Sequence, residues 1–171
     1  GSDPNSVLLV SEDAHSSFIK CIRIMGLDEA NLIRIKTDNN GSIDIQNLRK
    51  TIDKCFIDNK KIFAIVATLG TTVRGAIDPI KDISEICKER NIWLHIDGSI
   101  GGIFAITSIP IEGLNNINQA NSITINPQKI IGITKTSSLL LVSHSRTSYE
   151  LSLSLSALET PAVVFILITA L

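Results

Sequence analysis

Short runs of β-branched and aliphatic residues alternate along this chain with segments in which apolar side chains recur every three or four positions. The runs predict strands, and the periodic segments predict amphipathic helices. Such alternation is typical of parallel strands joined by crossover helices. The sequence therefore predicts an α/β fold with one mostly parallel, doubly wound sheet between two helical layers. We expect strands at 7–11, 31–36, 61–70, 92–97, 121–126 and 137–142, and helices at 15–26, 44–56 and 78–91.

The alternation continues without a repeat or a linker over residues 7–142, which is enough chain for one α/β domain. We interpret residues 1–6, GSDPNS, as a cloning scar or a cut end. Residues 143–171 comprise a short loop and the apolar stretch PAVVFILITAL, which is shorter than the roughly 20 residues of a membrane helix. Because apolar side chains need a surface to bury against, we expect the chain to continue there or to pair with another copy.

Charge and cysteine content narrow the classes of partner. The chain has a formal net charge of −1 and no basic block. Nucleic-acid-binding surfaces cluster Lys and Arg, so we expect neither a DNA nor an RNA partner. Cys21, Cys55 and Cys87 lie in predicted helices, at spacings that suit neither a disulfide framework nor a zinc site. We expect buried, reduced thiols in a cytoplasmic protein without a membrane span.

Four of the predicted strands are followed by polar residues. These segments are SEDAHSS from residue 11, ATLGTTVRGAID from residue 67, HIDGSIGG from residue 95 and NPQK from residue 126. Open α/β sheets bind ligands at the carboxyl ends of their strands, so we expect the four segments on one rim of the sheet. In the second segment, Asp78 is expected to cap the helix that starts with Pro79.

Single residues of these segments also have structural explanations. His15 suits a helix cap or an exposed position, Asp97 suits a turn, and Lys129 suits a solvated loop. Together they suggest a lysine that forms an imine with a pyridine cofactor, and a carboxylate that keeps the ring nitrogen protonated. A nucleotide-binding domain is the weaker alternative, because GSIGG does not match G-x-G-x-x-G and the chain has no P-loop.

The segments AHSS, ATLGTTVRGAIDPI, IWLHIDGSIGG and NPQK, in this order and at these separations, resemble the group II amino acid decarboxylases, which depend on pyridoxal 5′-phosphate (PLP). The resemblance covers residues 7–142 and implies an incomplete large domain of the type I PLP-transferase fold, the fold of aspartate aminotransferase. It implies that His15 stacks on the pyridine ring, that Asp97 pairs with the ring nitrogen and that Lys129 forms the Schiff base. Thr72 would line the cofactor pocket.

The implied reaction converts an L-amino acid to its amine and carbon dioxide, with His15, Asp97 and Lys129 as the catalytic residues. Two positions depart from the family pattern. Gln128 replaces a histidine before the lysine, and it is expected to donate a hydrogen bond to the cofactor phosphate without carrying positive charge. Ser99 places a hydroxyl where the family has a small apolar contact beneath the ring.

Members of the family are more than twice as long as this chain, and their upstream phosphate cradle and downstream small domain do not occur in the sequence. The alternative is therefore a catalytically inactive fragment or remnant with a binding or assembly role. Tyr149, the only tyrosine of the chain, follows the domain, and we favour a packing or surface position for it over proton donation. The resemblance also implies a homodimer with its sites at the interface.

Overall fold

The computed structural model describes residues 3–111, 113–132 and 138–143 in full and residues 162–167 as backbone. Tyr149 lies outside the described residues, so its position stays a prediction. The strands are β1 (Ser6–Ser11), β2 (Leu32–Ile35), β3 (Lys61–Thr68), β4 (Trp93–Asp97), β5 (Ser122–Ile125), β6 (Ser138–Ser143) and β7 (Ala162–Leu167). The α-helices are α1 (Ser17–Ile24), α2 (Ile45–Ile57), α3 (Ile80–Arg90) and α4 (Pro127–Ile130), and short 3-10 helices span Glu29–Asn31, Gly101–Ile106 and Leu114–Gln119.

These strands form one sheet in the order β2-β1-β3-β4-β5-β6-β7. Strands β1 to β5 pair in parallel, whereas β6 pairs antiparallel with β5 and β7 pairs antiparallel with β6. The predicted mostly parallel sheet is confirmed. From β1 the chain moves outward to β2 and then returns past β1 to β3, so the direction of strand addition reverses between β1 and β3. Open α/β sheets bind ligands at such a switch point.

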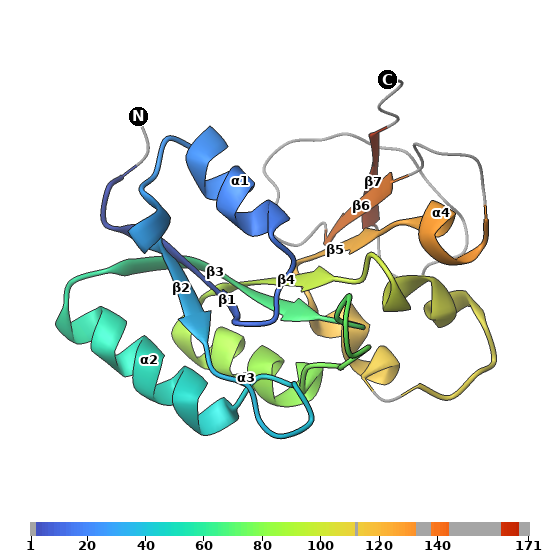
Figure 1. Ribbon diagram of the computed structural model, residues 1–171, viewed down its shortest axis with the longest axis horizontal. Helices are drawn as coiled ribbons and strands as arrows, with labels where there is room; N and C mark the ends of the chain where they lie inside the picture. The colour runs from blue at the N-terminus through green and yellow to red at the C-terminus, as the bar shows by residue number, and fades with distance from the viewer. Residues whose placement is uncertain (1–2, 112, 133–137, 144–161, 168–171) are drawn as a thin grey trace.

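Helices cover both faces of the sheet, which confirms the predicted layers (Figure 1). On one face, Leu48 and Ile52 of α2 and Ile83 of α3 are buried against the strands. On the other face, Ile22 of α1 is fully buried against a cluster that includes Val10. Within the described ranges, no helix combines the length and the apolar character that crossing a membrane requires.

Helix α2 shows how local sequence sets an element of this fold. The Asp44 carboxylate accepts hydrogen bonds from the backbone N–H groups of Gln46 and Asn47 at 2.8 and 3.0 Å. This N-cap satisfies donors that have no partner inside the helix. Leu48, Ile52 and Cys55 then recur on one face, and all three are buried. The predicted helix therefore begins and packs as its sequence pattern indicates.

The prediction that Cys21 is a buried thiol is wrong. Cys21 is exposed, whereas Cys55 and Cys87 are buried. Helix α1 is eight residues long, and Ile22 is its only buried residue. Because so short a helix covers the sheet with a narrow stripe, Cys21 lies outside the contact although it neighbours Ile22 in sequence.

The prediction that Asp78 caps α3 is also wrong. The N-cap position of α3 is Pro79, and no side chain caps this helix. The Asp78 carboxylate instead accepts hydrogen bonds from the backbone N–H groups of Ile43 at 2.8 Å and Thr68 at 2.7 Å. Asp78 is 1% exposed, so it joins the loop before α2 to the end of β3 from inside the fold. Two buried backbone donors compete successfully with the helix terminus for this carboxylate.

Asp78 is expected to make stability depend on pH. Burial raises its pKa to about 6, outweighing the hydrogen bonds from Ile43 and Thr68, which lower it. The native state then binds a proton that the unfolded chain has released, so this contribution to stability is greatest below pH 3.8 and is lost as pH rises through about 6. The shift corresponds to about 3 kcal/mol. Urea unfolding of wild type and Asp78→Asn at pH 4 and 7.5 measures it.

In the Asp78→Asn variant, this part of the pH dependence should disappear, because the amide does not titrate. The variant should also lose about 1–3 kcal/mol at low pH, since one amide oxygen replaces two acceptors. Asp82→Asn, which alters an exposed carboxylate on α3, is the matched control and should retain the wild-type pH dependence. An Asp78→Asn variant with an unchanged pH profile would contradict the assignment.

Candidate active site

A small pocket opens at the rim formed by the carboxyl ends of β1, β3 and β4. This rim includes the switch point between β1 and β3, where ligand sites of open α/β sheets lie. Of the six candidate residues named from the sequence, Gln128 alone is absent from the lining. The pocket is lined by Asp13, His15, Thr68, Gly70, Thr71, Thr72, Asp97, Ser99, Ile100 and Lys129.

Asp97 is the last residue of β4 and is half-buried. One of its carboxylate oxygens accepts a hydrogen bond from the backbone N–H of Ser99 at 3.1 Å. Among the described residues, none of the ion pairs includes Asp97. The negative charge is therefore available to a cationic group that enters the pocket.

Threonines flank Asp97 on both neighbouring strands. Thr68 of β3 and Thr124 of β5 are its partners in the parallel register, and partner side chains in a sheet lie on the same face. Thr68 is 4% exposed, and its hydroxyl is the one buried side-chain polar atom within the described residues that has no hydrogen-bond partner. Since leaving a buried hydroxyl unpaired costs free energy, this atom indicates a polar ligand group in the pocket.

Sequence reasoning missed Thr68. The available signal was the single polar residue at the end of the apolar run KIFAIVAT, next to the predicted pocket segment GTT. Thr71 was missed as well, although it lines the same pocket. Its hydroxyl accepts a hydrogen bond from the backbone N–H of Ala76 at 3.0 Å and so shapes the loop that carries Thr72.

His15 lies immediately before α1, at the carboxyl end of β1, and is exposed. Its Nδ1 accepts a hydrogen bond from the backbone N–H of Ser17 at 3.2 Å and lies 2.9 Å from the Ser17 hydroxyl. The ring thus supports the start of α1 and also lines the pocket. The structural and the functional interpretation of His15 are compatible.

Lys129 reaches the pocket from α4, the single helical turn that follows β5. Pro127 opens this turn at a position where a proline needs no N–H partner. Lys129 is exposed, whereas Gln128 is half-buried and is not among the residues that line the pocket. An amine from one strand end and the Asp97 carboxylate from another therefore share one pocket.

This arrangement suits a pyridine ring held between an acid and an amine, and the family comparison agrees. Residues 4–159 match the model of the pyridoxal-dependent decarboxylase conserved domain. The chain belongs to the pyridoxal-dependent decarboxylase family. The cofactor of this family is PLP, as the resemblance implied.

Curated relatives include decarboxylases with different substrates. The chain is 34% identical to the acidic amino acid decarboxylase GADL1 of Xenopus tropicalis over 130 residues, which is 76% of the chain and 25% of that protein. It is 31% identical to the aromatic-L-amino-acid decarboxylase of Bacillus atrophaeus over 125 residues, which is 73% of the chain and 26% of that protein. The chain thus spans about a quarter of the length of these relatives.

Solved structures of decarboxylases share the fold. Mouse CSAD matches with a TM-score of 0.73 and 29% identity, over 76% of this chain and 27% of that one. Catharanthus roseus tryptophan decarboxylase, solved in complex with L-tryptophan, matches with a TM-score of 0.68 and 29% identity, over 72% of this chain and 27% of that one. The predicted type I PLP fold, present here in part, is confirmed.

The pocket of this decarboxylase-family chain has the chemistry that PLP requires. Asp97 has a carboxylate that takes part in none of the ion pairs of the described residues, Lys129 has an amine, and the buried Thr68 hydroxyl has no hydrogen-bond partner. The residues present therefore fit the ring end of the cofactor.

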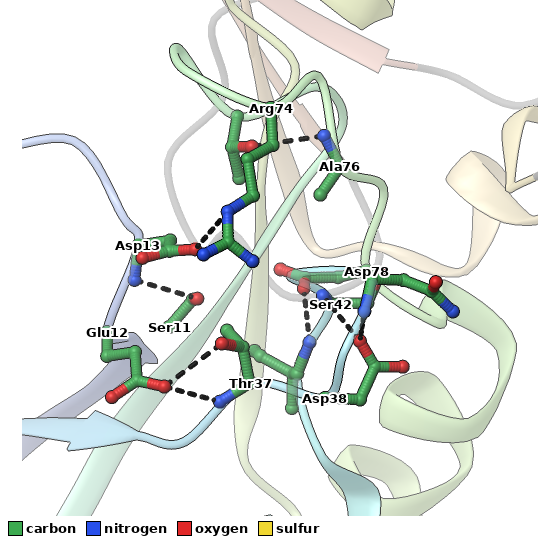
Figure 2. Close-up of polar contacts among 12 residues, drawn as sticks. Ser11, Glu12, Asp13, Thr37, Asp38, Ser42, Arg74, Ala76 and Asp78 are labelled. Carbon is green, nitrogen blue, oxygen red and sulfur yellow. Dashed lines mark hydrogen bonds and ion pairs between the residues drawn. The ribbon is translucent and has the colours of Figure 1, made fainter.

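Glu12 and Asp13, which precede His15 in the chain, contact Thr37 and Arg74 (Figure 2). The Glu12 carboxylate accepts hydrogen bonds from the backbone N–H and the hydroxyl of Thr37, at 2.8 and 3.0 Å, and these bonds lower the pKa of Glu12. The Asp13 carboxylate lies 3.8 Å from Nε of Arg74, in the loop after β3. Exposed ion pairs contribute about 0–1 kcal/mol, so this contact orders the rim more than it stabilises the fold.

A larger hollow opens beside the start of α3, but three of the carboxylates that line it, those of Asp38, Asp44 and Asp78, already accept hydrogen bonds from the backbone. Asp38 accepts hydrogen bonds from the N–H groups of Asn40 and Ser42. Asp44 caps α2, and Asp78 bonds two backbone donors. We therefore place the candidate site in the smaller pocket, where Asp97 and Thr68 retain unused polar atoms.

The segment GSIGG, which follows Asp97, has a packing explanation. A Cβ on Gly98 would lie 2.9 Å from the carbonyl oxygen of Thr124, and a Cβ on Gly101 would lie 2.6 Å from that of Leu69. The N–H of Gly101 donates to the same Leu69 carbonyl at 2.9 Å. These glycines let the exit of β4 approach the neighbouring strands closely, which differs from their use in a dinucleotide loop.

Gly101→Ala is expected to destabilise the chain by about 1–3 kcal/mol, because the new Cβ meets the backbone of Leu69, which cannot shift cheaply. Urea unfolding measures the change. Ser108→Ala, at an exposed position nearby, is the control and should stay within about 0.5 kcal/mol of wild type. Equal stability of Gly101→Ala and wild type would show that this approach is looser than the structure has it.

Proposed function

We propose that residues 7–142 form the PLP-binding core of an amino acid decarboxylase, which converts an L-amino acid to its amine and carbon dioxide. The observation that carries the proposal is the convergence of Asp97, Lys129 and His15 on one pocket from three strand ends. Membership in the pyridoxal-dependent decarboxylase family supports the chemistry. Bound PLP supplies an electron sink for the charge that remains when carbon dioxide leaves.

Each catalytic residue has a role that follows from its place. Asp97 places a negative charge where it keeps a pyridine nitrogen protonated. Lys129 holds an amine in the pocket, which would attach the cofactor through its aldehyde and would carry a proton. His15 presents a flat ring, suited to stacking on a pyridine, from a loop that Glu12 and Asp13 anchor.

Other residues of the rim bind rather than react. We propose that Thr72 and Ser99, which line the pocket, contact the pyridine ring of the cofactor and its substituents. We assign Gln128 to the cofactor phosphate, since an amide N–H donates to a phosphate oxygen without adding charge. The substrate stays an L-amino acid of open side-chain class, because relatives act on acidic and on aromatic amino acids.

We propose that the decarboxylase works as a cytoplasmic homodimer. Val73, beside Thr72, is 93% exposed, and Ile131, close to Lys129, is 53% exposed. Apolar side chains exposed around a pocket favour an interface. Free cysteines suit a reducing compartment. Sedimentation of the protein as a monomer at micromolar concentration would contradict the dimer.

The alternative is a catalytically inactive fragment or remnant of such an enzyme with a binding or assembly role. The two functions differ in what PLP does to the chain. An enzyme core should develop a visible absorption band with PLP, and borohydride should then fix the cofactor to Lys129, as peptide mass spectrometry would detect. Release of labelled carbon dioxide from a panel of carboxyl-labelled amino acids tests turnover. A colourless, unlabelled chain would overturn the proposal.

A further inference from the structure

Polar side chains connect β4 to β5 beneath Asp97. Nε1 of Trp93 donates a hydrogen bond to the Ser122 hydroxyl at 2.9 Å, and Nδ1 of His95 lies 2.8 Å from the same oxygen. Nε2 of His95 lies 3.3 Å from the hydroxyl oxygen of Thr124. Trp93, His95 and Asp97 alternate along β4, so their side chains lie on one face of the sheet. This polar row therefore leads from Trp93 toward the site carboxylate.

The donor and acceptor groups of the row determine the direction in which its hydrogen bonds point. An indole N–H only donates, so Ser122 accepts from Trp93. The hydroxyl hydrogen of Ser122 then needs an acceptor, and His95 Nδ1 is the acceptor that the described contacts offer. With Nδ1 unprotonated, the imidazole proton lies on Nε2 and is donated to Thr124.

The charge state of His95 agrees with this direction. Burial lowers the pKa of His95 and outweighs the nearby Asp97 carboxylate, which raises it. The ring is therefore neutral at neutral pH. An imidazolium would donate from both nitrogens and would leave the Ser122 hydrogen without its acceptor.

Thr124 is the last member of the row and the register partner of Asp97. Its hydroxyl oxygen accepts from His95, so its hydroxyl hydrogen is available to the Asp97 side of the strand pair. Thr68, on the other side of Asp97, has no such donor and stays unpaired. The two flanking threonines thus differ: Thr124 is oriented by the protein, and Thr68 is open to a ligand.

We propose that His95 is a positioning residue for Asp97: through Nε2–H it orients the Thr124 hydroxyl so that its hydrogen faces the Asp97 carboxylate and fixes the orientation of that carboxylate in the pocket. The hydrogen-bonded row formed by Trp93, Ser122, His95 and Thr124 consists of protein groups alone, so this orientation does not depend on a ligand. The proposal rests on the proposed function only for the role of Asp97 as the partner of the cofactor ring nitrogen.

The tautomer of His95 tests the internal part without any cofactor. Nitrogen NMR of the full chain, with the signal assigned by its loss in His95→Gln, should show a protonated Nε2 and an unprotonated Nδ1 at neutral pH. The Nδ1–H tautomer or an imidazolium would overturn the proposal, whatever PLP does.

Two pairs of substitutions test the link to Asp97. In His95→Gln the amide nitrogen occupies the place of Nε2 and keeps the donor to Thr124, whereas in His95→Asn the amide reaches only the place of Nδ1. Thr124→Ser keeps the hydroxyl, and Thr124→Val removes it. We expect His95→Asn and Thr124→Val to weaken PLP binding at least about tenfold, and His95→Gln and Thr124→Ser to stay within about threefold of wild type.

The dissociation constant is read from the visible band of bound PLP, and thermal unfolding of each cofactor-free variant is recorded beside it. Equal weakening within each pair would overturn the proposal, since loss of packing alone would not distinguish Gln from Asn. A wild-type chain that binds no PLP would refute the proposed function instead. The NMR result would then still decide the direction of the row.

Discussion

Replacing Lys129 with alanine is expected to remove the covalent attachment of PLP. Lys129 is the only lysine that lines the candidate pocket in the described part of the chain, and an alanine offers no amine to the cofactor aldehyde. The borohydride-fixed label should fall from about one per chain to background. Any decarboxylation should fall by about 10²–10⁴-fold, the usual effect of removing a residue that transfers a proton. Absorbance and peptide mass spectrometry after reduction measure both changes.

Lys36→Ala is the matched control for this experiment. Lys36 is an exposed lysine at the end of β2, outside the pocket lining. Its removal should leave the visible band and the labelled peptide unchanged, because Lys36 does not line the pocket. This result would separate labelling at the site from random modification of surface amines. Persistent labelling of the Lys129→Ala chain at wild-type yield would refute the role of Lys129.

Replacing Asp97 with asparagine is expected to weaken the cofactor site without disturbing its shape. The amide retains an oxygen for the N–H of Ser99 but loses the negative charge that a pyridinium needs. Removing one partner of such a charge pair typically costs 2 kcal/mol or more, so the dissociation constant of PLP should rise by roughly 30-fold. Decarboxylation should fall by about 10²–10³-fold, as when preorganised electrostatic stabilisation is removed. PLP titration and labelled carbon dioxide release measure the two effects.

Asp13→Asn removes a carboxylate from the same pocket and serves as the control. Asp13 pairs with Arg74 rather than standing unpaired at a strand end. Its loss should change PLP affinity by less than about threefold, because an exposed ion pair contributes little. Similar effects of the two substitutions would mean that the pocket responds to total charge and that Asp97 has no specific role.

Most of the fold follows from local patterns in the sequence. The apolar run 61–70 contains β3, and the capped, periodic segment 44–56 covers α2 except for its last residue, Ile57. These predictions succeed because β3 is buried along most of its length and α2 is buried along one stripe. The spacing of apolar residues in the sequence therefore matches the positions that are buried in the fold. Cys21 and Asp78 show where the agreement fails. Whether a helical position is covered, or which donor a carboxylate accepts, depends on neighbours that are distant in sequence.

The candidate site divides in the same way. His15, Thr72, Asp97, Ser99 and Lys129 were named from segments that follow predicted strands, and the structure lines one pocket with all five. Thr68 and the row through His95 were not found, because their significance lies in register between strands. A threonine at the end of a strand is unremarkable until its hydroxyl is buried beside Asp97 without a partner.

The sequence by itself determined the strand–helix alternation, the order of the polar strand ends and the resemblance to decarboxylases, because these depend on residue type and spacing along the chain. Only the tertiary structure decided that Asp97 lies between Thr68 and Thr124, that Asp78 is buried inside the fold and that His95 connects Trp93 to the site. The physical reason is that hydrogen bonds and desolvation act over a few ångströms in space. Residues tens of positions apart set these interactions once the sheet has brought them together.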